Sequence, residues 1–252
     1  MNTPDTSGAT AAATVIIARD GLDGLEILVI ERAAGMGFAG GAIAFPGGKV
    51  DAGDQKPLAG YTALAAEDAA GRVAAAREAF EETGILLSTG PAVAAKTRAH
   101  LRTESDKHRI AFAALLSSIG HILPADALKP FGRWLPPAGL HKRFDTRFYL
   151  ATCPAGEAPE ADGTEAVHAR WATPAKLLAQ ADAGTISILF PTRCNLARLG
   201  QFSGVAALLA DPTAPAFIQP SIVQTGAGKM LTIPEGLGYP YTQERLEMVR
   251  RT

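Results

Sequence analysis

Arg77-Glu78-Ala79-Phe80-Glu81-Glu82-Thr83-Gly84 is the stretch that decides the expected fold and chemistry of this chain. Its glutamates stand at positions i, i+3 and i+4, so a helix places all three within an arc of about 100° on one face. Val73, Ala76 and Phe80 fall on the opposite face. The pattern predicts a helix over residues 73–82 that packs its apolar face on a core, turns its carboxylates toward a cleft and ends near Gly84.

Three carboxylates packed this closely repel one another unless a cation lies among them. Hard oxygen ligands of this kind suit Mg²⁺ or Mn²⁺. Phe45-Pro46-Gly47-Gly48 lies upstream and predicts a tight glycine turn beside the helix. A metal site faced by such a turn favours chemistry on phosphates. An isolated Arg-Glu-x-x-Glu-Glu would more often be a solvated surface helix, but the glycine turn and Gly84 favour the metal site.

These motifs resemble the box of the Nudix hydrolase superfamily, which has the form G-x5-E-x7-R-E-U-x-E-E-x-G-U, where U is a bulky apolar residue. Gly48 opens the box, the stretch from Arg77 to Gly84 matches it with a small Ala79 at one apolar place, and Ile85 fills the last place. Asp54 stands where the family usually has Glu. Twenty-two residues separate Asp54 from Arg77, where the family usually has seven. The resemblance therefore predicts an insertion in the loop before the helix, which loops tolerate at modest entropic cost, and it leaves the role of Asp54 open.

One branch of the superfamily is similar in the same respect. The peroxisomal coenzyme A diphosphatases of animals and their bacterial relatives also have an enlarged box and a pattern like Arg143-Phe-Asp-Thr-Arg-Phe148. The resemblance implies an α+β fold, an α/β/α sandwich around a mixed β-sheet. It also implies a diphosphatase that cleaves coenzyme A or acyl-coenzyme A to 3′,5′-ADP and (acyl-)4′-phosphopantetheine.

Three alternatives remain open at this point. One is a Nudix pyrophosphatase on ADP-ribose, NADH or nucleotide sugars. Another is a non-catalytic ligand sensor with this fold, which the three retained box glutamates disfavour. The third is an isomerase of isoprenoid diphosphates, which needs a cysteine near the cleft, and neither Cys153 nor Cys194 lies near it in sequence.

The resemblance also implies roles for the acidic residues. Glu78, Glu81 and Glu82 are the expected ligands of Mg²⁺ or Mn²⁺, and Glu81 or Glu82 is also expected to orient or deprotonate the attacking water. Arg77 braces Glu81 one turn further along the helix. Many Nudix enzymes use a further glutamate outside the box, and we expect Glu165 in that role. Its competitors in the same loop are Glu157, Glu160 and Asp162.

Basic and glycine residues are the expected substrate-binding group. Arg143 and Arg147 are four residues apart, so an extended strand turns both to one face. Arg32 ends an early strand near a glycine-rich loop. Arginine suits bidentate phosphate contact, although a surface role or an ion pair is the alternative. Gly47 and Gly48 are expected to let the backbone turn beside the metal helix.

Composition predicts one folded domain. The chain has 252 residues, of which 47% are apolar and 19% charged, and we expect a single domain over 1–252 with a loose N-terminus (1–10). A helical insertion at about 94–140 is a candidate lid or dimer surface. The net charge of −1 gives no case for nucleic acid or acidic membranes. No run of eighteen apolar residues occurs, so no membrane partner is expected. A small-molecule nucleotide is the expected substrate. A homodimer, a cytoplasmic location and a bacterial source are further expectations.

Periodicity and turn signals predict the remaining elements. Thr173 is the expected N-cap of a helix that starts at Pro174. The predicted strands are 14–18, 26–31, 42–45 and 144–152, the predicted helices are 73–82, 94–129, 174–181 and those within 193–209, and a hairpin is expected within 221–234.

Overall fold

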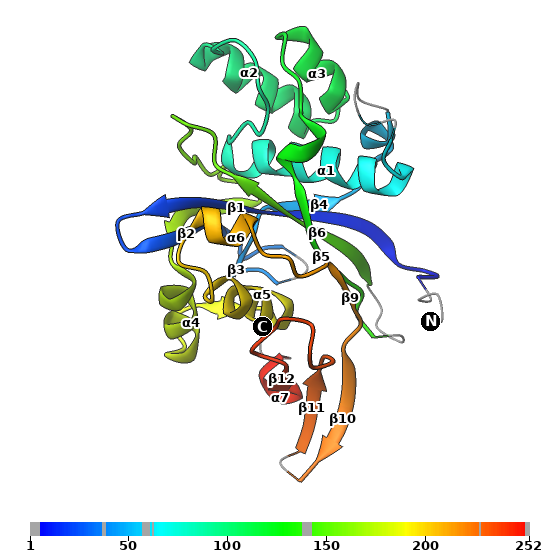
Figure 1. Cartoon of the computed structure of the whole chain (residues 1–252). Helices are drawn as coiled ribbons and strands as arrows, with labels where there is room; N and C mark the ends of the chain where they lie inside the picture. Colours follow the sequence, from blue (N-terminus) through cyan, green and yellow to red (C-terminus); the bar gives the residue numbers. More distant parts are fainter. Residues whose placement is uncertain are drawn as a thin grey trace.

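A mixed β-sheet with helices on both faces forms the body of the protein (Figure 1). The computed structural model describes residues 6–36, 39–56, 61, 63–137, 143–226 and 228–249. The main path of the sheet runs β8-β3-β2-β1-β6-β5-β9, while β4 pairs with β1 and β7 pairs with β2. Its strands are β1 (Thr10–Gly21), β2 (Gly24–Arg32), β3 (Ala42–Ala44), β4 (Gly47–Lys49), β5 (Lys129–Trp134), β6 (Phe144–Thr152), β7 (Ala166–Ala172), β8 (Ser187–Ile188) and β9 (Ala216–Ile218). The expected α+β sandwich is confirmed.

β1 lies at the centre of the sheet and positions Gly47 and Gly48 of β4. It pairs in parallel with β6 from Thr10↔Phe144 to Ala18↔Thr152. Its N-terminal half also pairs antiparallel with β4, with Ala13 opposite Gly48. A strand with helices on both faces is buried on both sides and is apolar throughout, as in the Val15–Ala18 run. The glycines of β4 are therefore fixed against a largely buried strand.

The two faces of the sheet carry separate cores. On one face α1 (Ala66–Thr83), α2 (Ala95–Asp106) and α3 (Phe112–Ser118) cover a cluster that includes Phe80, Phe112 and Tyr149. On the other face α4 (Pro174–Asp182), α5 (Phe190–Leu199) and α6 (Val205–Leu209) cover a cluster around Trp134. The Trp134 ring meets the ring of Phe190 edge-on at 6.3 Å between centroids.

α1 is longer than the sequence pattern predicts. It begins at Ala66 instead of residue 73, so half of the segment between Asp54 and Arg77 is helix and the expectation of a purely loop insertion is wrong. The alanine-rich sequence of 66–76 has high helix propensity. The helix contains Gly71 despite the low helix propensity of glycine, because a Cβ at this position would collide with the hydroxyl of Tyr149. The predicted end is confirmed, since Gly84 has φ 70° and its N–H donates to the carbonyl of Phe80 at 2.9 Å.

The predicted helical insertion is correct in its first part and wrong in its second. α2 and α3 lie within it, followed by a short 3₁₀ turn, η2 (Ala125–Ala127). Residues 129–134 instead form β5, which pairs with β6 and β9. The strand owes its burial to these long-range partners, which local periodicity does not reveal. Residues 138–140, the end of the predicted insertion, lie outside the described residues.

Residues 1–5 of the predicted loose N-terminus lie outside the described residues. The following segment is fixed, since Thr10 donates to the carbonyl of Arg143 at 2.9 Å and Ala9 to that of Thr6 at 3.0 Å. Near the other end, β10 (Ser221–Thr225) and β11 (Gly228–Thr232) form the predicted hairpin. With β12 (Gln243–Arg245) they make a separate sheet, followed by α7 (Leu246–Val249). The expectation of a single domain stays a prediction.

Most of the remaining predictions match the structure. β2, β3 and β6 lie within one or two residues of their expected bounds. α4 begins as predicted, with the Thr173 hydroxyl accepting from the N–H of Lys176 at 3.3 Å. The helical segment predicted over 193–209 is two helices, α5 and α6, separated by residues 200–204, and α5 begins three residues earlier than predicted, at Phe190.

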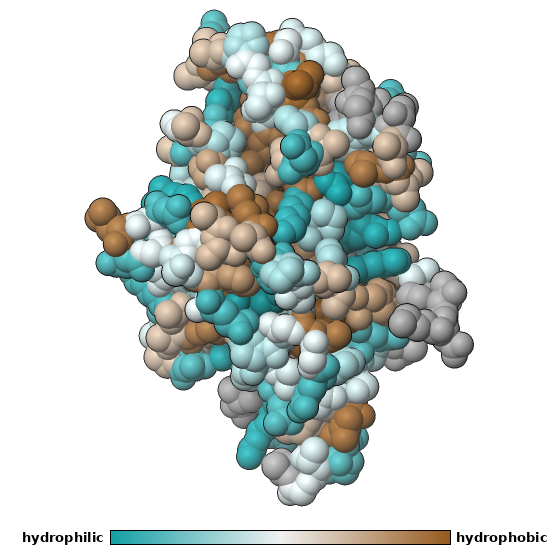
Figure 2. All heavy atoms as spheres, in the orientation of Figure 1, coloured by the Kyte–Doolittle hydropathy of each residue, from teal (hydrophilic) through white to brown (hydrophobic). Residues whose placement is uncertain are grey.

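The surface mixes apolar and polar side chains on the face shown in Figure 2. Leu22, in the turn between β1 and β2, is fully exposed. Isolated exposed apolar residues of this kind are normal on protein surfaces. Among the helices of the described residues, none has the length and apolar character needed to cross a bilayer.

Candidate active site

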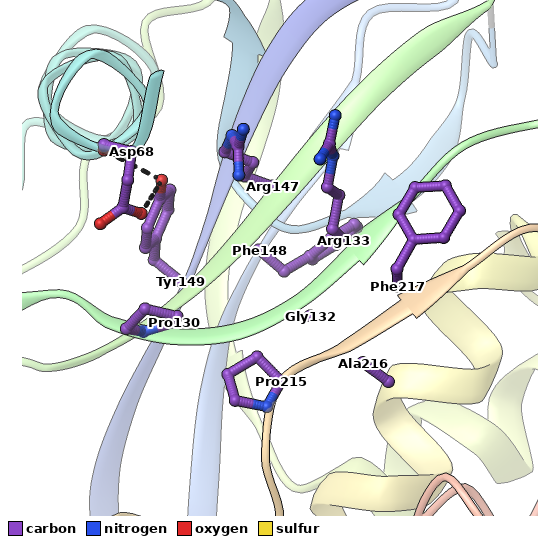
Figure 3. A pocket seen from close by; sticks show the side chains of 10 residues that line it. All are labelled: Asp68, Pro130, Gly132, Arg133, Arg147, Phe148, Tyr149, Pro215, Ala216 and Phe217. Carbon is purple, nitrogen blue, oxygen red and sulfur yellow. Dashed lines mark hydrogen bonds between the residues drawn. The ribbon is translucent and has the colours of Figure 1, made fainter. Parts of the chain in front are cut away.

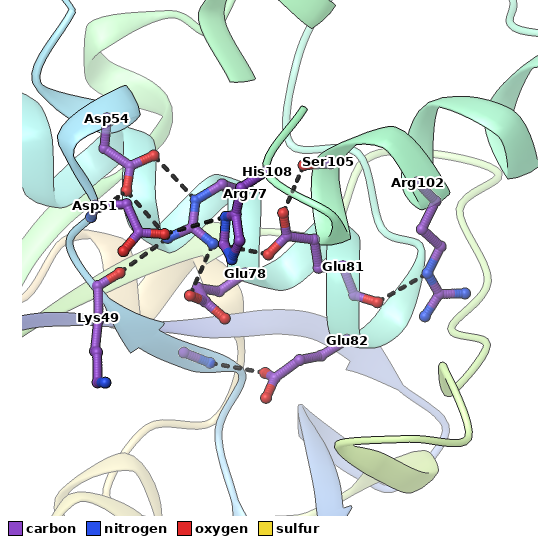
Figure 4. Close-up of polar contacts among 11 residues, drawn as sticks. Lys49, Asp51, Asp54, Arg77, Glu78, Glu81, Glu82, Arg102, Ser105 and His108 are labelled. Atoms are coloured by element: carbon purple, nitrogen blue, oxygen red, sulfur yellow. Dashed lines mark hydrogen bonds and ion pairs between the residues drawn. The ribbon is translucent and has the colours of Figure 1, made fainter. Parts of the chain in front are cut away.

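The last two turns of α1 carry the three box glutamates against β4 (Figure 4). All three are buried, with Glu82 only 2% exposed and Glu78 and Glu81 at 9% and 8%. The helix reaches this position because its opposite face, which includes Phe80, is fixed in the core. The expected split between an apolar face and an acidic face is confirmed, although the acidic face is more buried than a solvated cleft.

Arg77 is the centre of the hydrogen bonds that hold this cluster. Its guanidinium donates to both carboxylate oxygens of Asp54 at 3.0 Å, to Glu81 Oε2 at 2.7 Å and to the carbonyl of Lys49 at 2.9 Å. It also pairs with Glu78 Oε1 at 2.9 Å. Burial acts to lower the pKa of Arg77, but Asp54 and the two glutamates outweigh it and raise that pKa. The brace that sequence predicts for Glu81 is present and extends to two further carboxylates.

Glu82 differs from its neighbours because one of its oxygens is unpaired. Oε2 accepts from the backbone N–H of Gly47 at 2.9 Å. Oε1 is buried and has no hydrogen-bond partner among the residues that the structure describes. Burial, and then the charge of Glu78, raise the pKa of Glu82 well above its ordinary value. A buried carboxylate oxygen without a donor is costly, so this oxygen marks where a cation would be favourable.

The two glycines of β4 fit closely between the carboxylates and β1. A Cβ on Gly48 would lie 2.5 Å from the carboxyl carbon of Glu78, and one on Gly47 would lie 2.5 Å from the carbonyl oxygen of Ala13. Both positions therefore exclude every residue with a side chain unless a neighbour moves. Gly48 thus lies close against the carboxylate of Glu78 and Gly47 close against β1. Both lie in the strand β4 and not in the predicted turn, and their substrate-binding role stays a prediction.

The donor set fits Mg²⁺ or Mn²⁺ in its chemistry. It consists of carboxylate oxygens, which are hard ligands, and it includes the unpaired Glu82 Oε1. Burial raises the pKa of Glu78 to about 7, against the opposing charge of Arg77. The part of the chain that the structure describes contains no three acidic, histidine or cysteine side chains that already converge on one point. Arg77 explains this, because it neutralises Glu78 and Glu81 directly and draws them toward itself.

Glu165 and Arg32 belong to the same electrostatic neighbourhood. Glu165 is exposed at the start of β7, and its charge contributes to raising the pKa values of Glu78 and Glu82. Arg32 lies at the end of β2, and its charge acts to lower the pKa of Glu82. Its Nε is buried without a hydrogen-bond partner among the described residues. The N–H of Ala33 donates to the carbonyl of Glu165 at 2.9 Å. The catalytic role of Glu165 and the phosphate contact of Arg32 stay predictions.

The competitors of Glu165 have other partners. Glu157 forms a two-pronged ion pair with Arg98 at 2.5 and 2.7 Å. The Asp162 carboxylate accepts the N–H groups of the next turn, including that of Ala166 at 2.7 Å. The carbonyl of Glu160 accepts from Arg102 at 2.8 Å. The contacts of Glu157 and Asp162 engage their carboxylates, whereas the contact of Glu160 is through its backbone, so Glu160 stays a competitor of Glu165.

Arg143 and Arg147 lie away from the carboxylate cluster. Arg147 donates to Glu67 at 2.7 Å in the first turn of α1, and Glu67 is eleven residues, or about 16 Å, from Glu78 along the helix. Arg147 lines a cavity of about 210 Å³ with Arg133, Tyr149 and Phe217 among others (Figure 3). Arg143 donates to the carbonyls of Ser7 and Pro136. The structure therefore does not bring these two arginines together with the glutamates, and their binding of substrate stays a prediction.

The sequence pattern left two residues of the site without a role. Asp54 pairs with Arg77, and its place in the box, where the family usually has Glu, was the available signal. Ser105 donates to Glu81 Oε1 at 2.6 Å. It comes from α2, in the predicted insertion, and no local signal connects it to the box.

A comparison with family models matches residues 58–199 to the model described as the NUDT19 Nudix domain. The chain belongs to the Nudix family. The match covers more than half of the chain and includes α1 with all three box glutamates. The helical half of the box is therefore a feature of a Nudix domain and not a chance pattern.

Individual relatives agree with this assignment. The chain is 26% identical over 231 residues to the acyl-coenzyme A diphosphatase NUDT19 of Xenopus laevis, covering 71% of this chain and 61% of that protein. It is 27% identical to the protein of the same name in Homo sapiens, covering 74% and 63%. The chain thus spans somewhat over three-fifths of the length of these curated relatives.

A solved structure confirms the fold. The NUDIX hydrolase from Alicyclobacillus acidocaldarius superposes with a TM-score of 0.70 at 29% identity, covering 81% of this chain and 96% of that chain. The high coverage of the second chain means that its whole fold is present here. The Nudix fold inferred from the box is therefore established for this protein.

Proposed function

We propose that this protein is a metal-dependent hydrolase of the diphosphate linkage in nucleoside diphosphate derivatives. The favoured substrate is coenzyme A or acyl-coenzyme A, with 3′,5′-ADP and (acyl-)4′-phosphopantetheine as products. The observation that carries the proposal is the unpaired, buried Oε1 of Glu82 among three helical carboxylates. The name shared by the vertebrate relatives, acyl-coenzyme A diphosphatase, supports the substrate class.

A diphosphate resists hydrolysis because its charge repels the incoming nucleophile. A bound Mg²⁺ or Mn²⁺ supplies charge neutralisation and a water of lowered pKa. Glu82 and Glu78 are the residues that would hold the cation, with Glu81 beside them. Arg77 keeps the carboxylates in fixed orientations, which preserves the geometry needed for an in-line attack.

Two residues at the exposed side of the cluster complete the proposed mechanism. Glu165 is an exposed carboxylate within electrostatic reach of Glu78 and Glu82, and in this mechanism it accepts the proton of the attacking water. Arg32 has a buried Nε that lacks a partner among the described residues, and it contacts a phosphate oxygen of the substrate. Both side chains therefore act on the substrate from the ends of adjacent strands, β2 and β7.

The proposal is tested with a substrate panel. The purified chain is incubated with Mg²⁺ or Mn²⁺ and coenzyme A, acetyl-coenzyme A, ADP-ribose, NADH, nucleotide sugars or oxidised dNTPs, and products are separated by chromatography. We expect the highest kcat/KM for a coenzyme A species, and loss of turnover in Glu82→Gln. Clear preference for another nucleotide would overturn the choice of coenzyme A as substrate but not the proposed hydrolase activity. Binding without turnover of any substrate would favour a ligand sensor.

The isomerase alternative receives no support from the cysteines. Cys194 is buried in α5, in the core on the face of the sheet opposite α1. Cys153 follows β6 and hydrogen-bonds to the carbonyl of Pro154. Neither thiol is among the residues that contact the carboxylate cluster. The proposal also includes a cytoplasmic location, a homodimer and a bacterial source.

A further inference from the structure

The last turn of α2 reaches across to the catalytic helix through Ser105. This serine is 1% exposed, and its hydroxyl donates to Glu81 Oε1 at 2.6 Å (Figure 4). The other oxygen of the same carboxylate accepts from Arg77 at 2.7 Å. Short hydrogen bonds to an ionised group are the stronger kind. Glu81 is therefore held at both oxygens, whereas Glu82 is held at one.

α2 also holds the main chain of Glu81. Arg102, one turn before Ser105, donates from Nε to the carbonyl of Glu81 at 2.8 Å. This carbonyl is among the last four of α1, which lack partners within their own helix. The same arginine donates to the carbonyl of Glu160 at 2.8 Å and so connects the helix end to the loop before Glu165. Glu81 is thus held at its side chain and at its backbone by one helix.

A second connection runs from the end of α2 to Arg77. His108 lies just after the helix with a left-handed φ of 50°, a conformation that non-glycine residues adopt at some cost. Its Nδ1 lies 3.2 Å from Asp51 Oδ2, and the same oxygen lies 3.7 Å from Arg77 Nη2. The end of α2 therefore meets two partners of Arg77, Glu81 and Asp51, in a defined geometry.

We propose that Ser105 is a positioning residue for Glu81, and that α2 serves to deliver it. This inference rests on the proposed function. The physical reason is the orientation of the carboxylate. Arg77 holds only Oε2 of Glu81, because its other N–H groups are engaged by Asp54, Glu78 and the carbonyl of Lys49. Without the hydroxyl, Glu81 Oε1 loses its donor, and the carboxylate can rotate about its soft terminal bond and turn away from a cation. With Ser105 in place, both oxygens are held and the carboxylate keeps the orientation that the site needs.

The test compares Ser105→Ala with Ser105→Thr, which keeps the hydroxyl. Ser117→Ala is the matched control, because that hydroxyl donates to the carbonyl of Ala113 on the exposed side of α3. Mn²⁺ binding is measured by electron paramagnetic resonance in the absence of substrate, and kcat and KM are measured with coenzyme A. We expect Ser105→Ala to raise the Mn²⁺ dissociation constant at least about fivefold and to lower kcat at least about tenfold, with KM within about threefold, since changing a partner of a metal ligand typically costs 10–100-fold.

Ser105→Thr and Ser117→Ala are expected to stay within about twofold of the wild type in both measurements. Ser105→Cys, which keeps the size of the side chain with a weak donor, gives a second loss variant if Ser105→Ala does not fold, and it should behave as Ser105→Ala. Wild-type Mn²⁺ affinity and kcat in the folded loss variant would overturn the proposal, as would equal impairment of the alanine and threonine variants. If the wild type itself fails to bind Mn²⁺, the proposed function fails with it. If the wild type binds and turns over normally, a null result at Ser105 removes this inference alone.

Discussion

Asp54 receives two parallel hydrogen bonds from Arg77, Nε to Oδ1 and Nη2 to Oδ2, each at 3.0 Å. Twenty-two residues separate the two in sequence, yet the enlarged box does not separate them in space. The 3₁₀ turn η1 (Ala52–Gln55) holds Asp54, whose Oδ2 also accepts from the N–H of Asp51 at 2.8 Å. Asp54 thus fixes the arginine that in turn fixes Glu78 and Glu81.

Replacement of Asp54 by Asn should destabilise the protein by about 3 kcal/mol, because breaking a buried ion pair on one side leaves the other charge uncompensated. The side chains of Asp54 and Arg77 are 1% and 5% exposed. Urea unfolding measures the change. Asp51→Asn is the control, since its side chain is 40% exposed at 3.7 Å from Arg77, and we expect a loss under about 1 kcal/mol. Equal losses in the two variants would remove the special role of Asp54.

Glu82→Gln should separate stability from function. A carboxylate whose pKa is raised by burial is destabilised in its charged form at neutral pH, so in a chelator the variant should unfold at the wild-type free energy or above it. With Mn²⁺ at about 100 times its dissociation constant, the wild type should gain about 2.7 kcal/mol, or roughly 5 °C in Tm. The variant should gain far less. Its kcat should fall at least about 100-fold, because replacing a residue that only hydrogen-bonds to a metal ligand already costs about 10–100-fold. Calorimetry with and without Mn²⁺ measures the first effect.

Glu67→Gln is the control for this prediction. It removes a carboxylate of the same helix whose side chain is 78% exposed and pairs with Arg147. Its Tm response to Mn²⁺ and its kcat should match the wild type. If Glu82→Gln keeps the full Mn²⁺ response, or loses stability in chelator as a supporting core residue would, then the unpaired oxygen is not the cation site.

The Arg198–Asp211 pair predicts a pH dependence of stability. Burial would raise the pKa of Asp211, but hydrogen bonds from Thr213 and Arg198 lower it from 3.8 to about 2. The folded pKa lies below the unfolded one, so the stabilisation is complete above about pH 4 and is lost as the pH falls through 2. A shift of this size corresponds to at most about 2 kcal/mol.

Asp211→Asn should therefore lose at most about 2 kcal/mol at pH 7, and the difference from wild type should shrink toward pH 2 in urea unfolding. Asp182→Asn is the control, because that side chain is 67% exposed in its pair with Arg193 and should change stability by less than about 1 kcal/mol. A difference between wild type and Asp211→Asn that is the same at pH 7 and pH 2.5 would show that packing and not charge is responsible.

Local signals in the sequence were sufficient for the C-terminal part of α1. The spacing of the glutamates and the left-handed Gly84 depend on residues within one or two turns, so the end of α1 and its acidic face could be predicted. The same holds for β6, whose β-branched and aromatic residues favour a strand. The start of α1 was missed because Gly71 interrupts the alanine run. Glycine is needed there because of Tyr149, which comes from a distant strand.

Long-range strand pairing determines the features that local sequence signals do not predict. Lys129–Trp134 contains Pro130 and Gly132, which disfavour a strand by themselves, and it becomes β5 through pairing with β6 and β9. That pairing places Arg147 opposite Arg133 and away from the glutamates. The contact of Ser105 with Glu81 spans 24 residues, and no motif encodes it. Ser105, which comes from outside the box, therefore required the structure.

Gly48→Ala should impair activity while the fold is retained. A Cβ at this position would lie 2.5 Å from the carboxyl carbon of Glu78, and the flexible carboxylate can move more easily than the strand, which is fixed by its pairing with β1. The displaced Glu78 would leave both Arg77 and the cation position, so kcat/KM should fall at least about tenfold while Tm changes by no more than about 4 °C, the shift expected for about 1 kcal/mol. Gly35→Ala, where a Cβ meets nothing within 4 Å, is the control and should keep wild-type activity. Full activity in Gly48→Ala would mean that Glu78 need not occupy its observed position during turnover.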